Sequence, residues 1–203
     1  ECITNACIDA LHAGKTKYTA AKGLPDLCEA VARKLKRANS LEYTANQVII
    51  SSGGKQSLTM AFIALLNPGD EVIIPSPYWL SYPEMVRLAG GVPVFVKGED
   101  SKGFKLTPEM LEAAITPKTK AFVLNSPSNP TGLVYSEDEL RAFGEVCVKH
   151  NVWIVSDEMY ERMVYGGTKH ISIASLSPEF YDRTITINGL SKAYAMTGWR
   201  LGY

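Results

Sequence analysis

Short, uninterrupted apolar segments alternate along this chain with segments whose apolar residues recur at helical spacing. This alternation constrains the fold more than any other feature. Continuous apolar strands separated by helices are typical of a parallel sheet covered on both faces. We therefore predict a three-layer α/β/α fold with a mostly parallel sheet, in which residues 1–203 form one large domain. The predicted strands are residues 47–50, 71–74, 92–96, 121–124, 152–155 and 184–187, and the predicted helices are residues 26–37, 55–66, 82–89, 108 onward and 136–149.

Two of the predicted helices begin with recognisable capping residues. Thr107 is followed by Pro108, and proline suits the first turn because an N–H there would have no helical partner. Ser136 precedes Glu139 by three residues, which is the spacing of a capping box. These signals place two helix starts independently of the apolar pattern.

The charge balance offers no support for partners that bind mainly through electrostatics. Lysine and arginine together number 21, as do aspartate and glutamate, in a chain of 203 residues. Such a chain has no general attraction for nucleic acid or for an anionic membrane. No apolar stretch reaches the length of a membrane-spanning helix. We therefore expect neither a nucleic-acid partner nor a membrane partner.

The four cysteines form neither a metal-binding nor a disulfide pattern. None belongs to a CxxC pair or lies near a group of histidines, so no metal is predicted. A chain of this size can bury a sufficient core without disulfides. Reduced thiols and a cytoplasmic location are the default expectation. Because the chain starts at Glu1 and stops at Tyr203, we also expect it to have been cut from a longer protein.

The residues that directly follow each predicted strand are the first candidates for a site, because ligands of open parallel sheets bind beyond the carboxyl ends of the strands. These residues comprise a glycine pair, an aromatic side chain, an amide, a carboxylate with a tyrosine, and a serine–lysine pair. We expect all of them to face one crevice. The segments are residues 51–55, 76–79, 125–132, 157–160 and 188–192.

The glycine pair Gly53-Gly54 stands at the start of the predicted helix 55–66. Backbone N–H groups at a helix start bind phosphate well where no Cβ blocks the approach. An ordinary tight turn is the alternative interpretation. A P-loop is excluded, because that motif needs an earlier glycine and a hydroxyl residue after its lysine, where this chain has Ile49 and Gln56.

Lys192 and Asp157 have the most specific chemistry. Lys192 follows a strand and a glycine-containing turn, so its amine is expected in a partly enclosed site. Burial and a nearby cation such as Arg200 would favour the neutral amine, which forms imines with carbonyl compounds. Asp157 ends a buried strand, where an unpaired carboxylate would be unfavourable. A solvated lysine and a structural ion pair are the alternative interpretations.

Six motifs, taken together and in this order, resemble those of one enzyme family. The Ser-Lys…Gly-Trp-Arg block combined with Asn-Pro-Thr-Gly is highly specific, whereas the glycine pair alone is not. The pattern resembles the fold-type I, class I aminotransferases that depend on pyridoxal phosphate, and among them the bacterial-type aspartate aminotransferases. The resemblance covers essentially the whole chain. The motifs are residues 18–23 (YTAAKG), 52–56 (SGGKQ), 75–79 (PSPYW), 129–132 (NPTG), 156–160 (SDEMY) and 191–200 (SKAYAMTGWR).

The resemblance implies a role for each matching residue. Lys192 would bind pyridoxal phosphate covalently as a Schiff base and then act as general base and acid. Asp157 would pair with the pyridine nitrogen, and Asn129 and Tyr160 would hydrogen-bond the phenolic oxygen. Trp79 would stack on the ring. The phosphate would be held by Gly53, Gly54, Ser191 and Arg200, and in a homodimer by Tyr18 of the neighbouring subunit.

The implied reaction is transfer of an amino group between an L-amino acid and a 2-oxo acid. Lys55 would meet the distal carboxylate of aspartate or glutamate, or else lie at the rim of the phosphate. Trp79 and Asn129 would also contact the substrate. The same subgroup resembles prephenate and aromatic aminotransferases, so these substrates stay open.

Other functions on the same scaffold stay open as well. They are a β-lyase or carbon–sulfur lyase, a cyclopropane-forming enzyme, a cofactor-binding sensor module, and an inactive fragment that only dimerises. In the family, an amino-terminal segment covers the substrate and a carboxy-terminal small domain supplies the arginine for the substrate α-carboxylate. We expect both to lie outside residues 1–203, and transamination by these residues alone to be poor.

Overall fold

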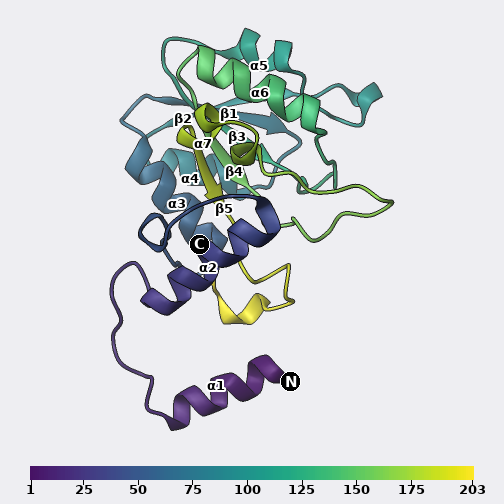
Figure 1. The fold of residues 1–203 in the computed structure, drawn as a ribbon. Helices are drawn as coiled ribbons and strands as arrows, with labels where there is room; N and C mark the ends of the chain where they lie inside the picture. The colour runs from purple at the N-terminus through teal and green to yellow at the C-terminus, as the bar shows by residue number, and fades with distance from the viewer.

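The computed structural model describes the backbone of all 203 residues and every side chain except that of Lys102. Its centre is a sheet of five parallel strands in the order β2-β1-β3-β4-β5 (Figure 1). Because every strand runs in the same direction, all five carboxyl ends meet at one edge. The strands are β1 (Glu71–Ser76), β2 (Val92–Lys97), β3 (Thr119–Asn125), β4 (Trp153–Asp157) and β5 (Thr184–Ile187).

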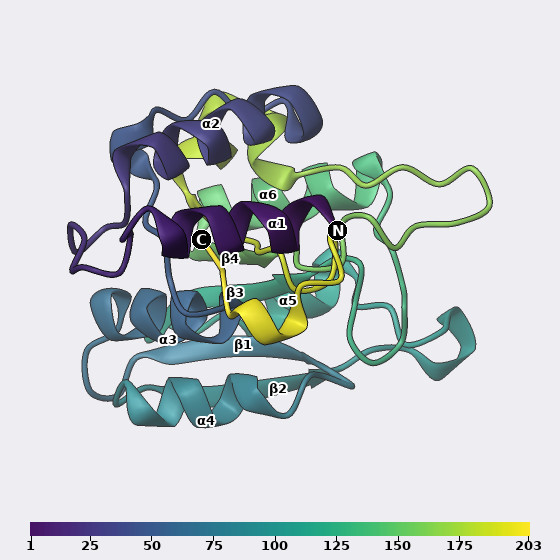
Figure 2. The same ribbon diagram turned by 90° about the horizontal axis from the view of Figure 1, so that it is seen from below.

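Helices cover both faces of this sheet (Figures 1 and 2). α3 (Gly54–Leu65) and α4 (Ser81–Leu88) pack on one face. α5 (Pro108–Ala114), α6 (Glu137–Lys149) and α7 (Pro178–Asp182) pack on the other face. The predicted three-layer α/β/α architecture with a parallel sheet is therefore confirmed.

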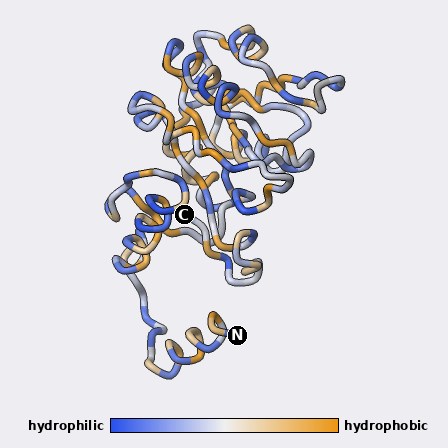
Figure 3. The backbone as a smooth tube through the Cα atoms, turned by 45° about the vertical axis from the view of Figure 1, so that its right-hand side comes forward, coloured by the Kyte–Doolittle hydropathy of each residue, from blue (hydrophilic) through white to orange (hydrophobic). Residues whose placement is uncertain are grey.

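Neighbouring residues of the inner strands enter opposite cores. In β1, Ile73 packs with α5 and α6, whereas Val72 and Ile74 pack with α3 and α4. In β3, Phe122 likewise packs on the side of α5 and α6, and Val123 packs on the side of α3 and α4. Because both faces are buried, these strands are continuous apolar runs in the sequence. Figure 3 shows them as hydrophobic segments inside the layered body.

Two helices lie outside these layers. α2 (Pro25–Asn39) packs through Cys28, Val31 and Leu35 into a third apolar cluster. α1 (Cys2–His12) buries none of its residues and stands apart from the layered body (Figures 1 and 3). No helix in the described part of the chain has both the length and the apolar character needed to cross a membrane. Four short 3-10 helices complete the fold: η1 (Ala45–Gln47), η2 (Asp100–Lys102), η3 (Ile173–Ser175) and η4 (Thr197–Trp199).

The local sequence signals agree with the structure at nearly every element. All the predicted helices are present, as are the strands predicted at 71–74, 92–96, 121–124, 152–155 and 184–187. The capping box is confirmed, because Ser136 Oγ accepts from the N–H of Glu139 (3.3 Å) and the Glu139 carboxylate accepts from the N–H of Ser136 (2.7 Å). Thr107 likewise caps α5 by accepting a hydrogen bond from the N–H of Met110.

The buried strand predicted at residues 47–50 is wrong. Gln47 is the last residue of η1, and residues 48–50 belong to no ladder; only Val48 is buried, while Ile49 is 65% exposed. A strand needs an extended neighbour over several residues to pair its backbone groups. Here the N–H of Ile50 donates to the carbonyl of Lys22, which lies in an irregular segment. The apolar residues therefore do not form a regular strand.

The strand order creates a crevice at the carboxyl edge. From β1 the chain adds β2 on one side and then crosses to β3 on the other side. The connections on the two sides of such a switch point separate, and ligands bind between them. The segments that follow β1, β3, β4 and β5 meet near this point.

Candidate functional site

A cavity of about 280 Å³ lies at the carboxyl edge of the sheet. Ligand pockets in proteins begin at about this size. Its walls come from the start of α3 and from the segments after β1, β3, β4 and β5. The predicted crevice therefore exists. The predicted residues that line it are Gly54, Lys55, Trp79, Asn129, Asp157, Tyr160, Ser191, Lys192 and Arg200.

Asp157 is the last residue of β4, and only 5% of it is exposed. The hydroxyl of Tyr82 donates to its Oδ2 at 2.6 Å, and the backbone N–H of Met159 donates to its Oδ1 at 3.2 Å. Burial raises the pKa of Asp157, and the charge of Glu158 adds to the rise, while the two hydrogen bonds oppose it. A carboxylate held in this way gains from a positively charged N–H partner inside the cavity.

Two asparagines join the ends of β3 and β4. Asn125 accepts a hydrogen bond from the N–H of Asn129 at 2.7 Å, and its Nδ2 donates to the carbonyl of Asp157 at 3.0 Å. Asn129 is thereby held where its Nδ2 donates to the hydroxyl of Tyr160 at 3.3 Å. The amide and the hydroxyl form adjacent donors on one wall, an arrangement suited to binding a single oxygen atom.

Lys192 lies in the segment that follows β5. Its Nζ is 5.7 Å from the centre of the Tyr160 ring. The preceding turn is well ordered by hydrogen bonds, because the N–H of Gly189 donates to Oδ1 of the fully buried Asn188 at 2.7 Å. A primary amine, which can act as nucleophile and proton carrier, therefore shares the cavity with the Asp157 carboxylate.

An aromatic ring and a second lysine form another wall. Trp79 meets Tyr82 edge to face, with ring centres 5.4 Å apart. Nζ of Lys55 lies 5.1 Å from the centre of the Trp79 ring, within cation–π range. This wall therefore offers a flat apolar surface beside a positive charge, which suits a planar ligand with an acidic group.

The start of α3 and Arg200 together form a corner suited to an anion. Gly53 has φ +82°, and a Cβ on it would overlap the Arg200 guanidinium; a Cβ on Gly54 would overlap Met159. Gly53 thus lets the guanidinium approach the N–H groups at the helix start, whereas Gly54 makes room for Met159. Nη1 of Arg200 also donates to the carbonyl of Thr197 at 3.1 Å. Both the helix dipole and the guanidinium favour negative charge here.

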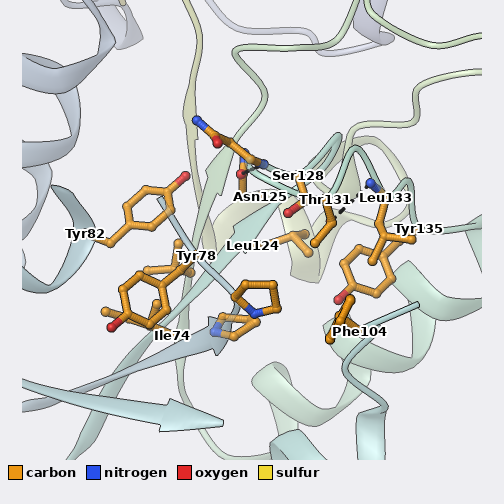
Figure 4. Close-up of a pocket in the computed structure, with 14 residues that line it drawn as sticks. Ile74, Tyr78, Tyr82, Phe104, Leu124, Asn125, Ser128, Thr131, Leu133 and Tyr135 are labelled. Atoms are coloured by element: carbon orange, nitrogen blue, oxygen red, sulfur yellow. Dashed lines mark hydrogen bonds between the residues drawn. The ribbon is translucent and has the colours of Figure 1, made fainter. Parts of the chain in front are cut away.

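A second cavity, of about 30 Å³, adjoins the first between the ends of β1 and β3 (Figure 4). Tyr82 and Asn129 line both cavities. Tyr78, Phe104 and Tyr135 surround the smaller one with aromatic rings. It has room for about one water molecule, so we interpret it as a packing gap beside the site.

Sequence reasoning missed several residues of the site, of which Tyr82 matters most. Tyr82 was expected only as the start of a helix, yet its hydroxyl contacts Asp157. One signal was available: a tyrosine three residues after Trp79, on the buried side of the first turn of α4, requires a hydrogen-bond partner. The other missed residues of the cavity wall are Leu58, Met159 and Thr197.

Two predicted residues do not line the cavity: Gly53, which lies against the Arg200 guanidinium beside it, and Tyr18, which is remote from it. The side chain of Tyr18 is fully exposed in the connection between α1 and α2. The resemblance assigned Tyr18 to the site of a neighbouring subunit, so its role stays a prediction.

Two relatives match nearly the whole chain. It is 56% identical over 201 residues to the aspartate aminotransferase of Geobacillus stearothermophilus, a match that covers 99% of this chain and 51% of that protein. It is 58% identical over 202 residues to the aspartate/prephenate aminotransferase of Cereibacter sphaeroides, covering 99% of this chain and 50% of that protein. The chain spans about half the length of these curated relatives.

The fold and a family model agree with these relatives. The solved structure of the Thermus thermophilus aspartate aminotransferase with maleate superposes with a TM-score of 0.94 at 50% identity, covering 98% of this chain and 51% of that one. The model for aminotransferase class I and II matches residues 1–203. Sequence, fold and family model agree over the full length of the chain, which therefore belongs to the class I and II aminotransferase family.

Proposed function

We propose that this chain forms the pyridoxal-phosphate-binding large domain of an enzyme that transfers an amino group between an L-amino acid and a 2-oxo acid. One observation carries the proposal: a single cavity gathers Lys192, Asp157, the Asn129–Tyr160 pair and Arg200. The family membership and the names of the relatives support it.

The residues present fit the parts of pyridoxal phosphate. A Cβ on Gly53 would overlap the Arg200 guanidinium, so this glycine lets the guanidinium lie against the start of α3, and the positive charge beside the helix N–H groups suits a phosphate. The buried carboxylate of Asp157 suits a protonated ring nitrogen. The donors of Asn129 and Tyr160 suit the phenolic oxygen. When bound, the cofactor supplies an electron-withdrawing ring that stabilises negative charge at the substrate's α-carbon.

Each residue of this chain then has a defined task. The amine of Lys192 would hold the cofactor until the substrate's amine displaces it, and the freed amine would then take a proton from the substrate's α-carbon and return one. Asp157 keeps the ring nitrogen protonated. Asn129 and Tyr160 orient the ring so that the proton transfer occurs at one face. Trp79 stacks on the ring and excludes water from that face of it.

Lys55 favours substrates with a second carboxylate, such as aspartate and glutamate. Its ammonium lies beside the Trp79 ring on the cavity wall, where it can meet a distal carboxylate. The Thermus relative with maleate, a dicarboxylate, supports this preference. Prephenate or aromatic substrates are the second candidate, supported by the name of the Cereibacter relative.

We further propose that the active protein is a homodimer in which Tyr18 of each chain reaches the phosphate site of the other. Tyr18 is fully exposed, and α1 leaves Ile8 and Leu11 exposed as well. These groups would become buried against a second copy. Mass determination by light scattering tests the dimer. Loss of cofactor affinity in Tyr18→Phe without dissociation of the dimer tests the contact.

The decisive experiment is a visible absorption spectrum of the purified protein with pyridoxal phosphate, recorded before and after L-aspartate is added. Lys192→Ala is the control, because it removes the amine and leaves the other lysines. We expect visible colour that requires Lys192 and that bleaches with L-aspartate. L-phenylalanine added in place of aspartate tests the aromatic alternative.

The outcomes separate the candidate functions. Bleaching by aspartate supports amino transfer, whereas sustained product formation without any 2-oxo acid would indicate a lyase. Colour that responds to no amino acid would indicate a cofactor-binding module. Colour of equal strength in Lys192→Ala would contradict the cofactor assignment.

A further inference from the structure

A cluster of buried polar side chains adjoins Asp157 and takes no part in the proposed cofactor contacts. At its centre is Glu158, of which only 1% is exposed. Its Oε1 accepts hydrogen bonds from the hydroxyls of Ser156 (3.0 Å) and Ser172 (2.6 Å). Its Oε2 accepts from Nδ2 of Asn39 at 3.2 Å and lies 3.0 Å from Nε2 of His170. The Glu158 cluster, as we name it, comprises Lys34, Asn39, Ser156, Glu158, Glu161, His170 and Ser172.

The second half of the cluster is an ion pair. Nζ of Lys34 lies 2.5 Å from Oε1 of Glu161, and it also donates to Oδ1 of Asn39 at 2.9 Å. Nδ2 of Asn39 donates to Oε2 of Glu161 at 2.8 Å, so Asn39 bridges the two carboxylates. Burial alone would raise the pKa of Glu161, but the Lys34 ammonium outweighs it and holds that pKa below its usual value.

A metal ion is a poor occupant for this cluster. Glu158, Glu161 and His170 each offer a ligand atom, and these atoms lie within 4.8 Å of one another. However, the Lys34 ammonium already supplies a cation, and a divalent ion would have to displace it against charge repulsion. The charges of the cluster are therefore balanced by its own protein groups, although Nδ1 of His170 is buried without a hydrogen-bond partner.

Stability alone does not account for so many buried charges. Removing an ion pair from water is costly, and apolar packing of the same volume is often equally stable or better. The cluster does connect distant parts of the chain, since Lys34 and Asn39 belong to α2 while Ser156 belongs to β4. It thereby anchors the turn after β4, which carries Asp157 and Tyr160.

Glu158 also acts on Asp157 through its charge. Burial is the main cause of the raised pKa of Asp157, and the negative charge of Glu158 adds to it. One group near Glu158 compensates its charge in part: the Lys34 ammonium, which lies 2.5 Å from Oε1 of Glu161. Burial raises the pKa of Tyr43 to about 12 and raises that of Tyr203 as well, so both phenols stay neutral. The remaining titratable members of the cluster are Lys34, Glu161 and His170.

We propose that Glu158 is a positioning residue of the cofactor site. It holds the turn after β4 against α2, and its negative charge adds to that of Asp157 in favouring a proton on the cofactor's ring nitrogen. The inference rests on the proposed function, because it requires pyridoxal phosphate in the cavity. Glu158 itself does not line the cavity.

The test is a pH titration of the visible absorption of the cofactor-loaded protein, comparing wild type with Glu158→Gln. Glutamine keeps the size and an acceptor oxygen but removes the charge. Without that charge the protonated, more positive form of the bound cofactor is less favourable. We expect the midpoint of the titration to fall by about half a pH unit, as for one partly screened charge nearby. The same free energy predicts a cofactor dissociation constant about threefold higher.

Matched variants separate the charge from simple loss of structure. Glu158→Asp keeps the charge and should restore the wild-type midpoint. Glu145→Gln removes a carboxylate from the exposed face of α6 and should change nothing. Ser172→Ala removes one hydrogen bond from Glu158 but no charge, so it should lower the melting temperature without moving the midpoint.

Lys34→Gln keeps the proposal testable even where Glu158→Gln does not fold. It removes a positive charge from the same cluster, so the midpoint should rise. A fall in both Lys34→Gln and Glu158→Gln would indicate local unfolding and overturn the proposal, as would an unchanged midpoint in either. If wild type shows no colour that depends on Lys192, the proposed function fails and this inference fails with it. If wild type shows that colour but Glu158→Gln titrates like wild type, only the inference fails.

Discussion

The end of β4 with the turn after it and the first 24 residues of the chain differ in how far their side chains are buried and hydrogen-bonded. In the turn, Asp157 and Glu158 are almost completely buried, and each accepts several hydrogen bonds. In the first 24 residues, α1 buries nothing and Tyr18 is fully exposed. Both regions carry residues that the family resemblance assigns to the cofactor site.

The difference shows which part of the proposed site is complete within one chain. Residues proposed to contact the cofactor of their own chain are held by neighbours that the same chain supplies, as Asn125 holds Asn129. A residue that serves another chain has no such neighbours until that chain is present. The comparison therefore predicts large effects for changes near β4 and small effects on folding for changes near Tyr18.

The largest effect is expected for Asp157→Asn. The substitution keeps the shape and removes the negative charge that would hold the ring nitrogen protonated. We expect turnover to fall by about 10²–10³-fold, a typical loss when one charge-stabilising group is removed. Steady-state assays with aspartate and a 2-oxo acid measure this, with circular dichroism as the control for folding. Turnover within threefold of wild type would remove Asp157 from its proposed role.

A tenfold effect is expected at the anion corner. Gly53→Ala places a Cβ against the Arg200 guanidinium, whereas Gly167 has the same φ of +82° and no atom within 4 Å of its would-be Cβ. Both alanines would need a φ of +82°, which residues with a Cβ rarely adopt. Only Gly53→Ala should weaken cofactor binding, by about tenfold or about 1.4 kcal/mol. Equal dissociation constants for the two variants, measured by fluorescence titration, would argue against a phosphate in this corner.

A smaller effect is expected on the stability of the protein without cofactor. The pKa of Asp157 is raised in the folded state, so its ionised form opposes folding. This destabilisation of the folded state is absent below the usual aspartate pKa of about 3.9, and it reaches its full size above the raised pKa. Asp157→Asn should therefore melt like wild type near pH 3.5 and at a higher temperature near pH 7.5, by about 2–4 °C for each kcal/mol regained. A melting difference that does not change with pH would contradict the raised pKa.

The smallest effect is expected for Tyr18→Phe. The side chain is fully exposed, so the free energy of unfolding of a single chain should change by less than about 0.5 kcal/mol. Urea unfolding at low protein concentration measures it. A loss of more than about 1 kcal/mol would show that Tyr18 packs on its own chain, and the contrast between Tyr18 and the residues near β4 would disappear.

Much of the fold follows from local patterns in the sequence. The strands buried on both faces were recognisable as continuous apolar runs, and the helix starts at Thr107 and Ser136 by their caps. The segment 47–50 has the same apolar pattern but no extended partner, and a pattern of side chains does not report whether a partner exists. The helices α7 and α1 were not predicted: α7 is only five residues long, whereas α1 has Ile3, Cys7 and Leu11 at helical spacing, a signal that could have found it.

The residues of the candidate site were recognisable because they follow strands of one parallel sheet. Nine of them, including Lys192, Asp157 and Arg200, line a single cavity. Sequence alone had no means of pairing Tyr82 with Asp157, which are 75 residues apart. The same holds for Asn39 and Glu158, which are 119 residues apart.

The sequence by itself determined the order of the elements, the parallel sheet and the types of side chain at its carboxyl edge, because these depend on local spacing and on the geometry that all parallel sheets share. The tertiary structure alone decided which buried group each of those side chains meets. Burial and hydrogen bonding depend on neighbours brought together by packing, so the raised pKa of Asp157 and the Glu158 cluster behind it became visible only in the folded chain.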